Sequence, residues 1–162
     1  MSKSTILGVI VVLLIVAGLF SISNYLSPNR AIVQSWKKVG VQCLTNGHTN
    51  LAQHIHQNLD IELDGVHQDI PANIGVLSNC LAEIHTHDSE QNLIHIESAE
   101  AGKEFKLKDF FTIWGEPFER AGYNTPIIVV DTATTTEGGD LILKDKMQIQ
   151  VLYVGSTQKA QE

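Results

Sequence analysis

The stretch Gln53–Leu63 reads QHIHQNLDIEL and alternates polar and apolar residues with the period of a β-strand. Successive side chains of a strand point to opposite faces, so His54 and His56 share one face. The same face carries Asn58, Asp60 and Glu62, and the opposite face carries Ile55, Leu59, Ile61 and Leu63. The sequence therefore predicts a half-buried strand whose histidines lie on the solvated side, opposite the core.

Two further histidine segments follow this strand. Residues 84–88 read IHTHD and residues 94–98 read IHIES, with a polar turn between them. If the turn centres on Glu90, His85 faces His95 across a hairpin. Directly opposed positions have Cβ atoms roughly 4.5–5.5 Å apart. Imidazoles from both strands therefore come close enough to reach one ion.

Asp64-Gly65 predicts a tight hairpin turn directly after the first strand. This turn places His67 opposite Glu62 on the polar face. We interpret His67 as a member of an ordinary cross-strand pair.

The recurring histidines make a metal site the first hypothesis. Imidazole-rich sites suit Zn²⁺ or Cu²⁺, which are the expected cofactors. The alternative is a hydrogen-bonded polar face without metal. The candidate ligands are five histidines and two carboxylates, which act as ligands or orient them: His54, His56, His85, His87, His95, Asp88 and Glu97.

Residues 6–22 (ILGVIVVLLIVAGLFSI) carry no charge. With their flanks they reach about 20 residues, the length that spans a bilayer core. The run is long for a signal-peptide core and lacks a clear A-x-A cleavage site, so an uncleaved anchor is favoured. Lys37 and Lys38 follow the span, but a short leader precedes it. We therefore expect a single-pass plasma-membrane protein with an extracytoplasmic C-terminal domain.

The rest of the chain predicts one α+β domain. Leu107, Phe110, Phe111 and Trp114 have helical spacing, which predicts a short amphipathic helix. The order hairpin, hairpin, helix, strand, strand predicts a small antiparallel or mixed sheet with one packed helix, in a β-grasp-like arrangement. The expected divisions are a membrane anchor over 1–27, a juxtamembrane linker over 28–42, the histidine-rich domain over 43–155 and a disordered tail over 156–162.

Cysteine count and charge restrict the remaining possibilities. Cys43 and Cys80 are compatible with one disulfide, although two free thiols or a thiolate ligand are the alternatives. The net charge of −7 argues against nucleic acid as a partner. The chain contains neither a P-loop nor a G-x-G-x-x-G motif, so nucleotide binding has no support.

The chain resembles an uncharacterised family of prokaryotic proteins in which an N-terminal hydrophobic segment precedes a histidine-rich domain. The resemblance covers roughly residues 43–154, and the HTHD and IHIES blocks are its most specific part. One departure is Gln91-Asn92, where the family usually has a glycine. The resemblance implies the domain boundaries and no established activity. The matching segments are His54–Gly65, Ile70–Gly75, Cys80, Ile84–Asp88, Ile94–Ser98 and Leu107–Gly115.

Three functions are compatible with these patterns. The first is non-catalytic metal binding by a membrane-anchored extracytoplasmic domain. The second is an extracytoplasmic interaction subunit of a membrane complex, without metal. The third is a small metal-dependent hydrolase in which Glu97 or Asp88 is the general base, although no H-E-x-x-H motif is present.

Overall fold

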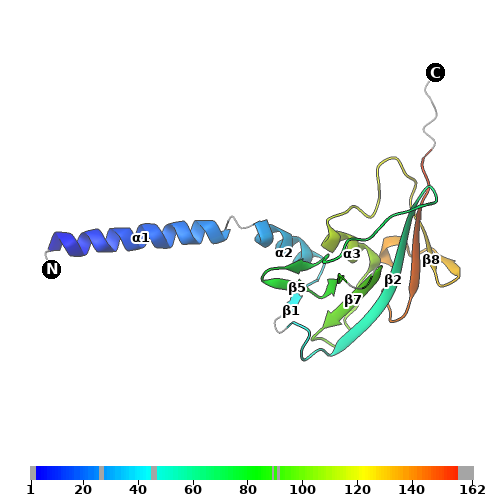
Figure 1. Cartoon of the computed structure of the whole chain (residues 1–162), viewed down its shortest axis with the longest axis horizontal. Helices are drawn as coiled ribbons and strands as arrows, with labels where there is room; N and C mark the ends of the chain where they lie inside the picture. The colour runs from blue at the N-terminus through cyan, green and yellow to red at the C-terminus, as the bar shows by residue number, and fades with distance from the viewer. Residues whose placement is uncertain (1–2, 26–27, 45–46, 89, 91, 157–162) are drawn as a thin grey trace, which may run out of the picture. The chain divides into compact units, whose positions relative to one another are not determined.

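The computed structural model describes residues 3–25, 28–44, 47–88, 90 and 92–156. The chain divides into two compact units, Met1–Gln34 and Ser35–Glu162. The first unit contains helix α1 (Lys3–Tyr25) and the start of helix α2 (Pro28–Lys38). Figure 1 labels both helices. Apart from Ser156, the predicted disordered tail lies outside the described residues.

Helix α1 occupies the position of the predicted membrane anchor. Crossing a bilayer core takes about 20 apolar residues in succession. Among the described residues, no helix combines the length and the apolar character that a membrane crossing needs. The prediction of a transmembrane helix within residues 1–27 is therefore wrong. The predicted single-pass plasma-membrane location with an extracytoplasmic domain, and the membrane as a partner, are wrong with it.

The second unit is α+β and is built on a mixed sheet. The strand order is β6-β7-β2-β10-β8-β9, and the short β3 also pairs with β2. Strands β2 and β10 are parallel, and the other pairs are antiparallel. Figure 1 shows β7, β2 and the red β10 side by side. The bounds are β2 Gln53–Leu63, β3 Val66–His67, β6 Ile84–His85, β7 Leu93–Ser98, β8 Ile127–Val130, β9 Ala133–Thr135 and β10 Gln148–Tyr153.

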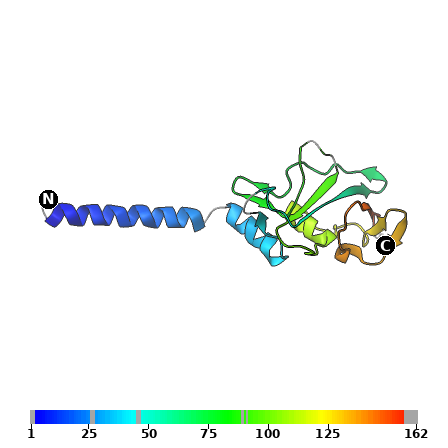
Figure 2. The same cartoon turned by 90° about the horizontal axis from the view of Figure 1, so that it is seen from below.

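One face of this sheet contributes the hydrophobic core. Apolar residues at alternate positions of β2, β6 and β7 share this face, and those at its centre are fully buried. Helix α3 (Leu107–Trp114), drawn in yellow-green next to the strands in Figures 1 and 2, buries its apolar side chains as well. The Asp109 carboxylate accepts the backbone N–H of Lys106 at 2.8 Å, which fixes the start of this helix. The main core residues are Leu59, Ile61, Ile84, Ile94, Ile96, Leu107, Phe110 and Phe111.

The same unit contains a second, three-stranded sheet. Its order is β1-β5-β4, with β1 Cys43–Leu44, β4 Val76–Leu77 and β5 Cys80–Ala82. A disulfide joins Cys43 to Cys80 across β1 and β5, with Cα atoms 5.1 Å apart. Strand β5 leads into β6 after one residue, Glu83. The small sheet is thus covalently closed next to the strand that carries His85.

Gly75 brings the chain close to β6. Its φ of +78° lies in the left-handed region, which favours glycine. A Cβ atom at this position would lie 2.5 Å from the carbonyl oxygen of Ile84 and 3.1 Å from the Cβ of Ala82. Neighbouring Ile74 accepts the backbone N–H of Thr86 at 3.1 Å. Glycine is therefore required here for the backbone to pair beside β6.

Candidate metal centre

The strand register aligns three histidines in one row. His56 of β2 is opposite His95 of β7, and His95 is opposite His85 of β6. In the next row His54 is opposite Glu97. The pairing of His85 with His95 is the one that the polar turn centred on Glu90 predicts. Because cross-strand partners share a face, these side chains all lie on the side opposite Ile94 and Ile96.

Two loops add a histidine each to this face. His87 follows β6, and its Nε2 lies 3.1 Å from Nε2 of His85. His48 lies in the loop between β1 and β2, and its Nδ1 lies 2.7 Å from Oε2 of Glu97. The sequence reasoning did not select His48 because it lies outside the alternating strands. One feature of the sequence does point to His48: it lies five residues after Cys43. The disulfide to Cys80 holds Cys43 next to the strand that leads to His85.

The prediction that the histidines occupy a solvated outer face is wrong for the centre of the row. His85 is 0% exposed, His95 is 6% and Glu97 is 1%. The loops carrying His48 and His87 contact this face and bury it. A polar cluster buried in this way requires internal partners, because an unpaired buried polar group costs free energy.

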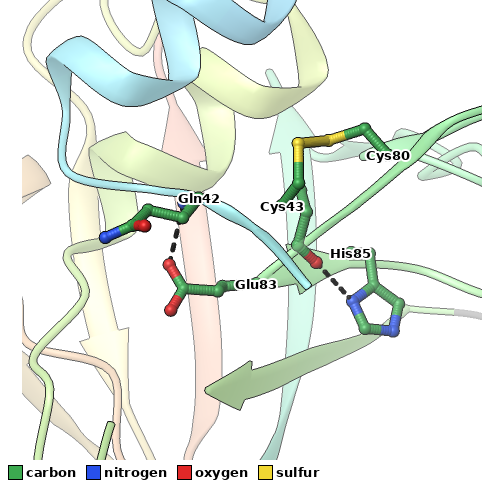
Figure 3. Close-up of a disulfide and its surroundings, with 6 residues drawn as sticks. Gln42, Cys43, Cys80, Glu83 and His85 are labelled. Carbon is green, nitrogen blue, oxygen red and sulfur yellow. Dashed lines mark hydrogen bonds between the residues drawn. A yellow bond between two sulfur atoms is a disulfide. The ribbon is translucent and has the colours of Figure 1, made fainter. Parts of the chain in front are cut away.

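The hydrogen bonds of His85 determine which nitrogen is free to bind a ligand. Its Nδ1 donates to the carbonyl oxygen of Ala82 at 2.9 Å, so Nε2 carries the lone pair. Figure 3 shows this imidazole near Glu83 and the Cys43–Cys80 disulfide. Burial disfavours the charged imidazolium and lowers the pKa of His85 to about 3. The ring is therefore neutral at neutral pH, which is the state that binds metal.

His95 has a nitrogen that no protein group satisfies. Its Nε2 donates to Oε2 of Glu90 at 2.5 Å. This hydrogen bond lowers the pKa of Glu90, while burial lowers the pKa of His95, so a neutral imidazole faces a carboxylate. The Nδ1 atom is buried and has no hydrogen-bond partner among the described residues. A buried lone pair without a donor fits a site in which a cation is the missing partner.

Glu97 is a buried carboxylate in the row next to that of His56, His95 and His85. Its Oε2 lies 2.7 Å from Nδ1 of His48, and its Oε1 lies 3.1 Å from Nε2 of His54. Within the part of the chain that the structure describes, both ion pairs of Glu97 are with histidines. Its charge therefore depends on imidazole protons or on a bound cation for compensation.

Three groups of side chains have ligand atoms within 4.8 Å of one another. They are His48/His85/His87, His54/His56/His95 and His85/His95/Glu97. An open cavity of about 620 Å³ lies over the cluster. Five histidines, three carboxylates and an amide line it: His48, His54, His56, His87, His95, Asp88, Glu90, Glu97 and Asn73. The cluster therefore has the donor atoms to bind a metal ion and is open to solvent on one side.

Asp88 differs from the other candidate ligands. It lies on the cavity wall, and its Oδ1 accepts a hydrogen bond from Nδ2 of Asn73 at 2.5 Å. It belongs to none of the three groups found among the described residues. Of the seven predicted site residues, the structure brings six together in these groups and adds His48.

Comparison with known proteins adds nothing to this geometry. No protein-family model, no curated protein and no solved structure matches the chain. The resemblance to a prokaryotic family and the β-grasp-like arrangement therefore stay predictions. The chemistry of the site follows from its own donor atoms: a cluster of histidines, partly buried, that could bind a metal ion.

Proposed function

We propose that the domain binds zinc or copper and does not itself catalyse a reaction. The observation that supports this proposal best is the pair formed by His85 and His87. Their Nε2 atoms lie 3.1 Å apart, and the other nitrogen of His85 donates to a backbone carbonyl. Neighbouring nitrogen ligands of a tetrahedral zinc ion lie about 3.3–3.4 Å apart, and a metal-bound histidine characteristically donates its second N–H in this way.

The donor set favours zinc or copper over other metals. Imidazole nitrogen suits zinc and copper, whereas calcium and magnesium take oxygen ligands. Cys43 and Cys80 are consumed in the disulfide, so they offer no thiolate. The sequence contains two methionines, Met1 and Met147, which is too few for a thioether site of the copper(I) kind.

The number of potential ligands supports a non-catalytic role. A catalytic zinc ion keeps one position open for water, and a structural or carrier site closes all four. Each of the three groups supplies three ligands, and because the groups share His85 and His95, a fourth donor for an ion is available from a neighbouring group. Glu97, the general base of a hydrolytic mechanism, contacts His48 and His54 instead and has little exposure to a substrate.

The test is metal affinity of the full chain, measured by calorimetric titration of metal-free protein with Zn²⁺ and with Cu²⁺. His85→Ala should weaken binding more than about 100-fold, since even loss of a residue behind a ligand costs 10–100-fold. His67→Ala is the matched control, because His67 pairs with Asp60 outside the three groups. Equal affinities of wild type and His85→Ala would refute metal binding at this cluster.

The open cavity supports a metal-dependent hydrolase as a second candidate. Its wall includes the exposed carboxylate of Glu90, which can accept a proton from a metal-bound water. Zinc-loaded protein would then hydrolyse an activated ester such as p-nitrophenyl acetate, and Glu90→Gln would abolish turnover while the zinc content stays unchanged. Turnover no faster than that of free Zn²⁺ excludes this candidate.

A further inference from the structure

We propose that the cluster binds two metal ions in one dinuclear centre, with the buried Glu97 carboxylate as the bridging ligand. This inference rests on the proposed function and specifies the number of ions and their connection. It assigns Glu97 a role as a ligand to both ions, in place of the general base or single ligand that the sequence suggests.

The histidines divide into two sets that have no member in common. One set is His48, His85 and His87, and the other is His54, His56 and His95. In each set, one nitrogen per residue lies within 4.8 Å of the others. Six of the seven histidines of the chain are thus used once, three for each ion.

Glu97 lies between the two sets and contacts both. Its Oε2 lies 2.7 Å from Nδ1 of His48, which belongs to the first set. Its Oε1 lies 3.1 Å from Nε2 of His54, which belongs to the second. Each oxygen of one carboxylate therefore faces a different set, which is the arrangement of a bridging carboxylate.

The number of donor atoms agrees with two closed shells. Six imidazole nitrogens and two carboxylate oxygens make eight ligand atoms. Zinc in non-catalytic sites is almost always four-coordinate, so eight ligand atoms complete two ions. A single ion would leave several of these polar groups without a cation, although His85, His95 and Glu97 are all buried.

The two sets are in contact, so two ions bound to them are neighbours. The ring centroids of His87 and His95 lie 4.6 Å apart, and those of His85 and His95 lie 5.4 Å apart. Metal ions of dinuclear sites lie about 3.5–4 Å apart and repel each other. The Glu97 charge between them reduces this repulsion, and Asp88 and Glu90 add negative charge on the cavity wall.

The experiment is a titration of the full chain with Zn²⁺, followed by native mass spectrometry, together with electron paramagnetic resonance of the Cu²⁺-loaded protein. We expect saturation at two zinc ions per chain and a spin-coupled Cu²⁺ pair. Saturation at one ion overturns the dinuclear centre and leaves metal binding intact. Saturation at zero overturns both proposals. Two ions with uncoupled Cu²⁺ spectra overturn the bridge.

Single variants locate each ion. His48→Ala and His54→Ala remove one ligand from different sets, and both side chains are about half exposed, so folding should tolerate either change. Each variant should bind one ion at the zinc concentration that loads two into wild type, with the second affinity reduced at least tenfold. His67→Ala should still bind two. Two tightly bound ions in both His48→Ala and His54→Ala would contradict the assignment of ligands.

Glu97→Gln tests the bridge itself. The amide keeps the size of the side chain but lacks the charge that two cations share. We expect loss of spin coupling and at least tenfold weaker binding of the second ion, while circular dichroism reports whether the domain stays folded. If the folded variant binds two coupled Cu²⁺ ions as wild type does, Glu97 does not bridge them. If the variant unfolds, the His48→Ala and His54→Ala results decide the question.

Discussion

The two halves of strand β2 carry similar residues on the same face and end in different environments. In the first half, His54 lies 3.1 Å from Glu97. In the second half, Asp60 lies 2.6 Å from His67 of β3. The side chains of His54 and His67 are both 47% exposed, and each lies within ion-pair distance of a carboxylate, so the histidines alone do not distinguish the two pairs. The difference lies in what surrounds them.

The first half of β2 is flanked by strands that carry further imidazoles. Residues 53–58 pair with β7, and β6 lies beyond it with His85. The second half pairs only with the two-residue β3 on that side. The partner carboxylate is 1% exposed in the first case and 32% exposed in the second. Strand alternation therefore creates a polar face, but neighbouring strands and loops decide whether that face becomes a site.

The largest expected effect is a pH dependence of the free energy of unfolding that arises from His85, in the histidine cluster beside the first half of β2. In the metal-free protein the pKa of His85 is lowered from 6.5 to about 3, so the unfolded chain binds more protons between these values. The free energy of unfolding is therefore greatest above pH 6.5 and declines as the pH falls toward 3, because the unfolded chain gains a proton that the native imidazole does not. At about 1.4 kcal/mol per pKa unit, the decline is on the order of 5 kcal/mol.

Urea unfolding of metal-free protein at a series of pH values measures this decline. His85→Gln removes the titrating group, so its stability should fall less steeply between pH 6.5 and 3 than that of wild type. His67→Ala, in the other half, should follow the wild-type curve. Parallel curves for wild type and His85→Gln would show that His85 titrates normally.

The second effect comes from the disulfide, which joins β1 to β5 next to the strand that carries His85. The bond closes a loop with a sequence separation of 37, and a loop of this size corresponds to about 4 kcal/mol of stability. The Cys43→Ser/Cys80→Ser double variant should lose about this amount in urea unfolding. His48, five residues after Cys43, should also lose its fixed position, which imidazole NMR signals would report.

The same NMR spectra contain the control for the disulfide. The His67 signal should stay unchanged in the double variant, and a reductant should destabilise wild type but not the variant. A loss of less than 1 kcal/mol would mean that the β1–β5 pairing holds the small sheet without the covalent bond.

The third effect compares two glycines with positive φ, Gly75 next to β6 and Gly65 in the turn after β2. A Cβ atom at Gly75 would meet the Ile84 carbonyl at 2.5 Å, whereas a Cβ atom at Gly65 would meet nothing within 4 Å. Gly75→Ala should therefore combine backbone strain with a steric clash and cost about 3 kcal/mol. Gly65→Ala should cost only the strain, about 1 kcal/mol. Thermal or urea unfolding of both variants gives the difference, and equal losses would contradict the close approach of Gly75 to β6.

The smallest effect is expected at the exposed pair. His67→Ala should change the free energy of unfolding by no more than about 0.5 kcal/mol, because substitutions away from buried features are usually this mild. His67 lies between Asp60 and Asp69, both outside the cluster, and exposed ion pairs contribute little. A loss above 1 kcal/mol in urea unfolding would show that this half of β2 is as tightly coupled to the fold as the other.

The sequence predicts what depends on neighbours along the chain. The alternation of residues 53–63, the Asp64-Gly65 turn and the spacing from Leu107 to Trp114 match β2, the β2–β3 hairpin and α3. The opposition of His85 and His95 follows from one polar turn. Each of these features is set by a local period or a short turn.

Features that depend on distant contacts are not visible in the sequence. The strands of the small β1-β5-β4 sheet are two or three residues long, too short to show a period. Helix α2, in the region where the sequence predicts a linker, does carry local signals, since Pro28 begins it and Lys37 and Lys38 lie in its last turn. The loop that carries His48 reaches Glu97 across 49 positions of the chain. The burial of His85 and His95 follows from such loops, so the polar pattern of the strands indicated exposure instead.

The parallel pairing of β2 with β10 affects how the nascent chain matures. Asn58 pairs with Gln148, and every histidine precedes residue 96, so the ribosome delivers all the imidazoles before the strand that completes the sheet. At about 5–20 residues per second, the 53 positions from His95 to Gln148 take roughly 3–11 s to synthesise. During that interval the imidazoles are already exposed to cellular ions, while β2 still lacks one of its two flanking strands.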